Sequence, residues 1–541
     1  MKNNKCPICG EHHEYLIKAF HSEVDQPILD LLSDEVPDWR AELGACTRCI
    51  DQAQLELQLS ILKAKEEPAE INGYKILPIP TRLLADTKQK GKGVTICIID
   101  SGFYLHPDLI FPKNRILKIL DITQPDRDES YFTRPHNNSW HGTMTSVICT
   151  GNGHLSGGMY RGLASEANLV LIKVSDENGA ISGNNIAKAL QWAVENSTQY
   201  NIKIINLSVT DDFDIPHKKS QVDQAVEHAV KKGISVVAAS GNNPDAPVLP
   251  PANSPYAITV GGLNDRNTLD PLLNTLYHST FGETVDRFQK PDIIAPAIWL
   301  AAPILPNTKE QREAEALFDL YYSDDKFIKA KLANLLHKTS LSKELLFQKT
   351  AIIKEAISHK INDAKYISPH YQHADGTSFA APIICSVIAQ MLEVNPLLDP
   401  YTVREILFIT ARHIPGEKAE RQGWGVIRPG HAVQMAAGNK LKSNAEVTPI
   451  VDYRNMVANF FINCSYAQEV VLTGDFINWR KEGVPMQRSK NGNWKTNIKF
   501  NNSGIYRYKF LIDKKEWTSD PRNLYRENDG FNGFNSKLII L

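Results

Sequence analysis

Short apolar runs that alternate with helical patterns are the feature that most limits how this chain can fold. The first run, residues 94–99, is continuous and ends at Asp100, which is typical of a strand buried on both faces of a parallel sheet. Residues 184–195 and 222–232 carry apolar residues at helical spacing. This alternation predicts an α/β fold with a doubly wound parallel sheet. The further expected strands are residues 169–174, 202–209, 234–239 and 257–260.

A second pattern surrounds Ser378. Gly376 leads a turn into a run of small apolar residues, which predicts a buried helix with Ser378 at its N-terminus. Taken alone, the stretch fits either a nucleophilic serine or a serine that only caps the helix. Asp100 follows the first strand, and His141 begins another expected helix. The order acid, base, nucleophile is one of those found in Ser-His-Asp triads.

Several blocks around these residues resemble the signature segments of subtilisin-like serine proteases. The blocks are Asp100-Ser-Gly, His141-Gly-Thr, Ala239-Ser-Gly-Asn242, Lys290-Pro-Asp-Ile-Ile-Ala-Pro296 and Gly376-Thr-Ser-Phe-Ala-Ala-Pro382. The resemblance covers about residues 91–437 and implies a serine endopeptidase domain over residues 71–437. It implies a triad of Asp100, His141 and Ser378, with the amide of Asn242 as an oxyanion donor. It also implies a substrate-binding edge formed by Ser208, Val209, Thr210 and Gly241.

The chain departs from the family pattern in two places. Thr210 and the acidic residues 211, 212 and 214 stand where glycines usually follow. We expect a stiffer substrate edge, and the acidic residues either favour basic peptide residues or form a solvated loop. A long insertion at residues 300–372 carries expected helices at 309–322, 325–336 and 342–361. It could serve as a lid, a docking surface, an oligomer contact or a structural outgrowth.

Two Cys-x-x-Cys pairs mark the N-terminal segment, residues 1–70. Four thiolates from Cys6, Cys9, Cys46 and Cys49 suit a closed, structural zinc site. Redox-active or merely reduced cysteines are the alternatives. A helix is expected at residues 27–33. Calcium is a second candidate cofactor, for which the sequence indicates no ligands. His12, His13 and His21 are candidate substitute ligands for zinc, but polar surface positions are the favoured interpretation of these histidines.

The C-terminal part, residues 455–541 after a linker at 438–454, predicts short strands of an Ig-like β-sandwich. The expected strands are residues 457–463, 469–472, 494–500, 504–512 and 537–541. Segments such as Leu472-Thr-Gly-Asp-Phe-Ile-Asn-Trp479 resemble the glycogen-binding module of AMP-activated kinase β subunits. That resemblance implies sugar contacts by Trp479, Lys509, Trp517 and Asn535, whereas Trp494 is expected in the core. Such modules also serve as protein-contact domains.

Composition and net charge limit the kinds of partner that this chain is expected to bind. The chain has 541 residues and a net charge of −1, so no overall field points to nucleic acid or an anionic membrane. We find no signal-like N-terminal run and no segment near the ~20 apolar residues of a membrane-spanning helix. The eight cysteines lack the dense spacing of a secreted disulfide framework, which indicates reduced thiols and a cytoplasmic location. The singly placed cysteines are Cys97, Cys149, Cys385 and Cys464.

These observations leave three interpretations. We expect an intracellular endopeptidase that acts on protein or peptide substrates. The alternative is a scaffold or adaptor that uses the protease fold and the sandwich mainly to bind partners, and the complete triad pattern argues against it. In the third interpretation the sandwich is an α-glucan anchor that brings the protease to glycogen-associated proteins.

Overall fold

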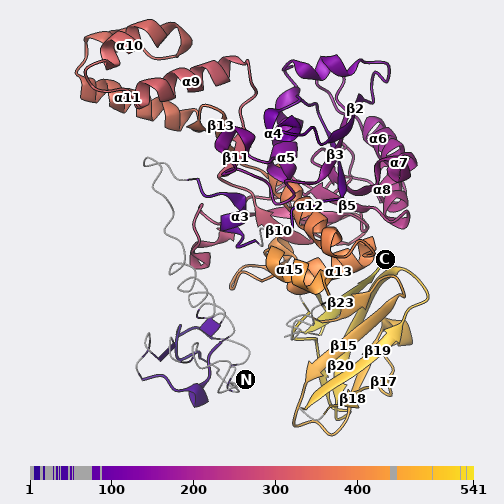
Figure 1. The fold of residues 1–541 in the computed structure, drawn as a ribbon. Coiled ribbons are helices and arrows are strands. Elements are labelled where there is room, and N and C mark those ends of the chain that lie inside the picture. Colours follow the sequence, from indigo (N-terminus) through magenta and orange to yellow (C-terminus); the bar gives the residue numbers. More distant parts are fainter. Residues whose placement is uncertain are drawn as a thin grey trace.

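The computed structural model describes most of the chain from residue 76 onward and part of the first 53 residues. It describes residues 76–438 without 86 and 87, and 448–541 without 490, 491, 524 and 532, together with 5–12, 16, 18, 29, 32, 33, 36, 38–46, 49, 50 and 53. The helix expected at 27–33 falls mostly, and His13 and His21 fall wholly, outside the described residues. In Figure 1 a helical insertion and a β-rich domain lie at opposite ends of a central α/β body.

The central body contains the expected parallel sheet. Its strands run in the order β10-β6-β5-β4-β1-β3-β2, all parallel, and β7 (Thr275–Leu276) pairs antiparallel with β6. Every residue of β1 is buried, as its continuous apolar run requires. The bounds are β1 (Thr95–Asp100), β2 (Ile116–Asp121), β3 (Asn168–Lys173), β4 (Ile202–Leu207), β5 (Ser235–Ala239), β6 (Ile258–Asn264) and β10 (Ile293–Pro296).

Helices cover both faces of this sheet, which confirms the doubly wound fold (Figure 1). Helices α5 (Ser139–Thr150), α12 (Thr377–Val394), α13 (Pro400–Thr410) and α15 (Pro429–Ala436) share one core with the sheet. The other core contains residues of α6 (Gly183–Glu195) and α8 (Gln221–Lys231). Helix α12 has the length and apolar composition of a membrane-spanning helix, contrary to our expectation, but 83% of its residues are buried. It is the central core helix of the body.

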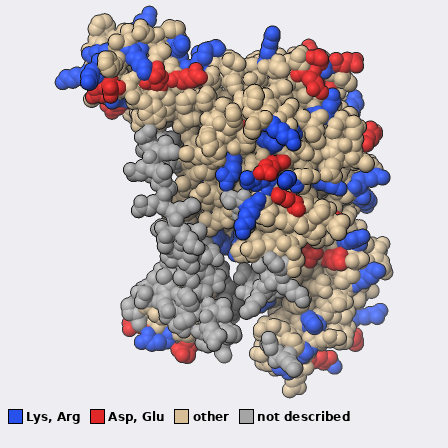
Figure 2. Space-filling view, in the orientation of Figure 1, with Lys and Arg blue, Asp and Glu red and all other residues tan. Residues whose placement is uncertain are grey.

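The insertion folds around a small core of its own. Its helices are α9 (Lys309–Tyr321), α10 (Ile328–Leu335) and α11 (Thr350–Asp363), whose apolar faces meet at Leu317, Ile328 and Ile353. Part of the third expected helix, Lys343–Phe347, is instead a 3-10 turn. The insertion leaves the body at β11 (Leu300–Pro303) and returns through β12 (Tyr366–Ser368) and β13 (Tyr371–Ala374). Figure 2 shows charged side chains of both signs gathered on these projecting helices.

The C-terminal domain is a sandwich of two antiparallel sheets, as predicted. One sheet contains β14 (Ile450–Asp452), β15 (Val457–Asn463), β19 (Asn493–Lys499) and β18 (Gln487–Arg488). Its partner contains β17 (Val484–Pro485), β16 (Val470–Gly474), β20 (Gly504–Ile512), β23 (Phe534–Ile540), β22 (Arg526–Asn528) and β21 (Glu516–Thr518). Trp494 is 5% exposed and belongs to the core, as expected.

The sandwich begins earlier than the sequence predicts. Strand β14 lies inside the stretch expected to be linker, yet it pairs in register with β15. Its three residues, Ile-Val-Asp, are too few to give a strand signal of their own. The strand also contacts α13 of the body, so the two domains are packed against each other from this point on. Further contacts join Arg404 to the ring of Tyr453, and Trp424 to Tyr525.

Candidate active site

Asp100 and His141 form a tight pair at the carboxyl end of the sheet. Asp100 is the last residue of β1 and is fully buried, and His141 lies in the first turn of α5. The distance between His141 Nδ1 and Asp100 Oδ1 is 2.6 Å. Thr145 donates its hydroxyl to Asp100 Oδ2 at 3.1 Å, and the N–H of Ser101 donates to Oδ1 at 2.7 Å. The carboxylate is therefore held in place by three donors.

The charge of Asp100 also sets the ionisation of His141. Burial by itself would lower the pKa of the imidazole, but the negative charge of Asp100 and the hydrogen bond to it outweigh burial. The net effect is a pKa raised above the ordinary 6.5. An imidazole that is held by a carboxylate on one nitrogen and is more basic than usual is suited to accept a proton on the other.

Ser378 occupies the first turn of α12, next to this pair. Gly376 precedes the helix with φ +141, a backbone region that favours glycine. The ring of His141 lies 5.6 Å from that of Phe379, the residue after Ser378. The hydroxyl of Ser208 donates to the carbonyl of Ser378 at 2.9 Å and fixes this turn to the end of β4. The structure thus places the helix turn that carries Ser378 beside the Asp100–His141 pair, although these segments lie far apart in the sequence.

Asn242 lies against the same turn. Its Oδ1 accepts hydrogen bonds from the N–H of Thr377 at 2.9 Å and from the Thr377 hydroxyl at 3.1 Å. Because these two donors fix the amide oxygen, the Nδ2 hydrogens face away from Thr377. Asn242 is exposed, so Nδ2 is available to a bound molecule. The N–H groups in the first turn of a helix have no partner within the helix, and that of Ser378 is among them.

The expected substrate edge follows β4. Ser208 and Val209 are buried at 8% and 7% exposure, whereas Thr210 is exposed. Gly241 has φ +106, and a Cβ there would lie 2.5 Å from Thr280 Oγ1, so the position needs glycine. The neighbouring Asp211 points its carboxylate at the start of α6, where a Cβ on Gly183 would lie 2.2 Å from Oδ2. Its position beside a helix N-terminus accounts for that acidic residue without a bound peptide.

Two supporting residues were not predicted. Thr145 is one helical turn after His141 on the same helix, so the i, i+4 spacing was a signal that could have identified it. Thr280 was not detectable in this way. Its hydroxyl donates to the carbonyl of Asn243 at 2.8 Å and its N–H to the carbonyl of Gly241 at 3.0 Å, across many residues of sequence. Thr280 therefore supports the loop that carries Asn242.

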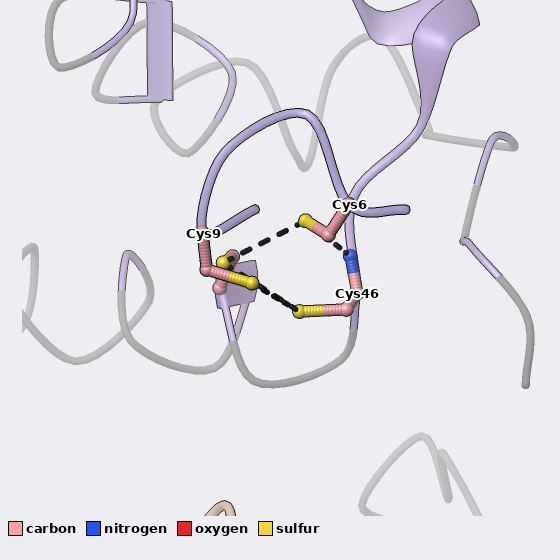
Figure 3. A group of neighbouring side chains, drawn as sticks. Cys6, Cys9 and Cys46 are labelled. Carbon is pink, nitrogen blue, oxygen red and sulfur yellow. Dashed lines mark hydrogen bonds between the residues drawn. The ribbon is translucent and has the colours of Figure 1, made fainter. Parts of the chain in front are cut away.

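The four N-terminal cysteines converge, as expected for a metal site. Their Sγ atoms all lie within 4.8 Å of one another, with 3.9 Å between Cys6 and Cys49 and 3.8 Å between Cys9 and Cys46 (Figure 3). Tetrahedral zinc with Zn–S bonds of about 2.3 Å requires sulfur atoms about 3.8 Å apart. No disulfide joins these residues. The donor set therefore fits zinc, and His12 lies outside this group of ligand atoms.

The environment of the cysteines differs within the group. Burial raises the pKa of Cys6, but hydrogen bonds led by that from the backbone of Cys9 outweigh it and lower the pKa to about 7. Burial raises the pKa of Cys46 to about 11. Gly10 has φ +75 and its N–H donates to the carbonyl of Cys6, which closes the turn between the first two ligands. Among the described residues, no other group of three or more His, Cys, Asp or Glu side chains could hold an ion.

The expected sugar-contact residues lie on the second sheet of the sandwich. On β20 the buried Tyr508 and Phe510 face the core, so Lys509 faces outward between them. Leu511 pairs with Trp517, which is 39% exposed, and Tyr508 pairs with Ser536, so Asn535 faces outward as well. Trp479 follows β16 with φ +56, an unusual backbone region for a bulky residue and one found at ligand sites.

Lys509 has a partner that the sequence did not reveal. Its Nζ forms an ion pair with Asp529, and this contact lowers the pKa of Asp529 to about 2. Asp529 Oδ1 also accepts from the N–H groups of Phe531 and Gly533. These bonds order the loop before Asn535, on which Phe531 and Phe534 are 90% and 52% exposed. This part of the sandwich therefore carries two exposed aromatic rings.

Each of the two parts of this chain is similar to known proteins. Residues 460–538 match the model described as the glycogen recognition site of AMP-activated protein kinase. The serine protease AprX of Bacillus subtilis (strain 168) is 30% identical over 326 residues, which cover 59% of this chain and 61% of that protein. Subtilisin-like protease 2 of Arthroderma otae is 36% identical over 252 residues, covering 46% of this chain and 51% of that protein.

Two further matches are to a second Bacillus subtilis protease and to a solved structure. The major intracellular serine protease of Bacillus subtilis (strain 168) is 31% identical over 196 residues, 35% of this chain and 56% of its own. The solved structure of the prenylagaramide maturation protease PagA covers 67% of this chain and 98% of its own at 18% identity, with a TM-score of 0.42. The chain thus spans about half to three fifths of the curated relatives it matches. Residues 91–425, more than half of the chain, match the model of the subtilase family, to which this chain therefore belongs.

Proposed function

We propose that the protein is a serine endopeptidase that uses Asp100, His141 and Ser378. The observation that carries this proposal is the 2.6 Å contact of His141 with buried Asp100 beside the first turn of α12. His141 would accept the Ser378 proton as Oγ attacks the peptide carbonyl, and then protonate the departing amine as the C–N bond breaks. Water then attacks the acyl-enzyme as His141 accepts a proton from it, and His141 passes this proton to Ser378 Oγ as the acyl C–O bond breaks. Asn242 Nδ2 and the Ser378 N–H would stabilise the oxyanion.

Covalent labelling tests this proposal directly. A fluorophosphonate probe should attach to the peptide that contains Ser378, because the probe reports an activated serine. The His141→Ala variant should remain unlabelled, since the base is missing. Ser208 serves as an internal control, because its hydroxyl is committed to the Ser378 carbonyl and should not react. Absence of label on the folded wild-type chain would reject the proposal and favour the scaffold interpretation.

Asn242→Ala is expected to lower kcat about 10²–10³-fold, with a much smaller change in KM. The side chain would bind the oxyanion, which develops in the transition state and is absent from the bound substrate. The measurement is steady-state hydrolysis of an internally quenched peptide. Asn243→Ala is the matched control, because the substitution keeps the backbone contacts of Asn243 with Thr280. Equal losses in both variants would point to disruption of the loop and not to an oxyanion donor.

The pH dependence should report the raised pKa of His141. Because only the neutral imidazole accepts the Ser378 proton, kcat/KM should rise with pH through the pKa of His141. The midpoint should lie above 6.5, since Asp100 shifts that pKa upward. His136→Ala, which changes a histidine stacked on Tyr131, should leave the midpoint in place. A wild-type midpoint at or below 6.5 would contradict the influence of Asp100.

We further propose that the sandwich binds α-glucan and anchors the protease on it. Exposed Trp517 and outward-facing Lys509 and Asn535 support this. Trp517→Ala should lower co-sedimentation with glycogen about tenfold, since one aromatic stacking platform would be lost. Tyr322→Ala removes a ring of the insertion that is 57% exposed, more than Trp517, and should have no effect. No sedimentation of the wild-type chain would instead leave the sandwich as a protein-contact domain.

The remaining assignments complete the proposal. We propose zinc as a structural ion on the four N-terminal cysteines, where it would link two distant segments of chain and supply no chemistry to the peptidase site. All eight cysteines are free, which supports a reducing, cytoplasmic location. The near-neutral net charge supports protein substrates over nucleic acid or membrane partners.

A further inference from the structure

A cavity lies between the protease body and the sandwich. Its volume is ≈ 330 Å³, within the range of small-molecule sites. The walls come from both domains, so the cavity exists only where they meet. The body contributes His217, Lys218, Asp286, Arg287 and Phe288, and the sandwich contributes Gly504, Ile505, Arg507, Glu527 and Lys537.

The sandwich wall carries two cations side by side. Arg507 on β20 and Lys537 on β23 are directly paired in register, and both lie on the outer face of the sheet. Like charges at such a pair are unfavourable unless anions compensate them. Arg507 has Glu527 and Asp475 as partners, and Lys537 has Glu283, at 2.6 Å, from the protease body. Lys537 is only 5% exposed. Because Glu283 belongs to the protease body, the ion pair of Lys537 also joins the two domains.

The protease wall leaves two cations unmatched. Asp286 is occupied by His217, which donates its N–H at 2.6 Å and places Nδ1 at 2.9 Å from the same carboxylate oxygen. Arg287, at the tip of the hairpin of β8 (Gly282–Glu283) and β9 (Gln289–Lys290), is exposed. Neither its guanidinium nor the exposed ammonium of Lys218 has a hydrogen-bond or ion-pair partner within the described part of the chain. Both line the cavity.

The rest of the lining suits a carbon skeleton. Phe288 is buried and Ile505 half-buried, and both present apolar surface. At Gly504 a Cβ would meet only Tyr506, at 3.9 Å, so the backbone there is approachable. Uncommitted cations beside apolar surface match a small molecule with one dianionic group. Guanidinium and ammonium groups together are the usual partners of phosphate, which accepts several charge-assisted hydrogen bonds.

We propose that this interdomain cavity binds a small organic phosphate, a phosphate monoester whose anionic group lies between Arg287 and Lys218. Its carbon part would lie against Ile505 and Phe288. Since the ligand would contact both domains, its binding would stabilise their contact. Ile505 and Arg507 lie on the same outer face of β20 as Lys509, one of the proposed sugar-contact residues. The phosphate could therefore be carried by a sugar or by a non-sugar skeleton. The proposal depends on neither peptide hydrolysis nor glucan binding.

Calorimetry on the full chain tests the site with defined probes: glucose 6-phosphate, glycerol 2-phosphate, inorganic phosphate and glucose. We expect both monoesters to bind, with affinity that falls as salt is added, and glucose not to bind in the cavity. Arg287→Gln and Lys218→Ala should each weaken binding about tenfold or more, the effect of losing a hydrogen bond to a charged group. Lys219→Ala, next to Lys218 but outside the lining, should bind as the wild type does.

Three results would overturn the proposal. The first is that no phosphate probe binds at millimolar concentration. The second is that Lys219→Ala weakens binding as much as Arg287→Gln, which would indicate a diffuse charge effect. The third is that only glucose 6-phosphate binds and Trp517→Ala abolishes its binding, which would place the ligand at the proposed sugar site around Trp517 and not in the cavity. Arg287 and Lys218 are exposed, so their variants should fold, and a melting curve without ligand verifies this.

Discussion

Ser378→Ala is expected to lower kcat for peptide hydrolysis by about 10⁶-fold, the magnitude known for loss of the nucleophile in enzymes of the subtilisin type. The substitution removes the atom that forms the acyl-enzyme but keeps the first turn of α12, the Ser378 N–H and the Asn242 amide. A residual rate should therefore survive, about 10³–10⁴-fold above uncatalysed hydrolysis. The loss should appear in kcat, with KM nearly unchanged. Quenched-peptide hydrolysis under saturating substrate measures it.

Ser386→Ala provides the matched control. Ser386 is on the same helix and buried, and its hydroxyl donates to the carbonyl of Ile383 within the helix, away from His141. The two variants undergo the same chemical change, but only one carries the proposed nucleophile. Ser386→Ala should keep kcat within about threefold of wild type, as a substitution that costs a little stability does. Undiminished hydrolysis by Ser378→Ala would end the endopeptidase assignment.

Removal of the metal from the four-cysteine site should unfold the N-terminal segment and leave the rest of the protein folded. The described core of this segment is small: beside the four cysteines, its larger fully buried side chains are Leu32 and Trp39. A core of that size does not hold a fold, whereas structural zinc contributes about 10–16 kcal/mol of apparent binding free energy. Chelation should therefore abolish hydrogen-exchange protection in residues 5–12 and 38–46, and metal analysis should find one zinc lost per chain.

Two variants sharpen this experiment. Cys6→Ser should lose zinc and protection together, because Cys6 is fully buried within the cluster. His12→Ala should keep both, since His12 lies outside the group of ligand atoms. The melting of the subtilase domain should be the same in all three proteins. Full protection without metal, or a disulfide in the oxidised protein, would support the redox interpretation of these cysteines instead.

The sequence predicted the parallel sheet well because its inner strands are continuous apolar runs. It missed β2, since the first half of this edge strand is partly exposed, with Leu117 at 44%, and only its second half is buried. It also did not reveal β14, whose pairing depends on a neighbour rather than on its own residues. Strand β20 was predicted, and within it Tyr506, Tyr508 and Phe510 alternate with Arg507 and Lys509, which is a strong local signal. Trp494, which was predicted in the core, is the buried residue of β19.

The candidate site shows the same division. Asp100, His141, Ser378 and Asn242 could be identified because each belongs to a short contiguous motif. Thr280 and Asp529 act through contacts with residues far away in sequence, so no local pattern marks them. The interdomain cavity was beyond prediction for a further reason. Arg287 and Lys537 belong to different domains, and only the packing of those domains places both side chains on the wall of one cavity.

The helical insertion has a property that matters for protein engineering. It begins and ends on paired residues, because Pro303 faces Tyr371 across β11 and β13. The N–H of Ile304 donates to the carbonyl of His370 at 2.8 Å. The positions at which the chain enters and leaves the insertion are therefore joined by a hydrogen bond. Its helices meet around their own core. The insertion can therefore be replaced by a short turn or exchanged for another domain. Because β11 and β13 would remain paired, the chain segment that leads to Ser378 would keep its position.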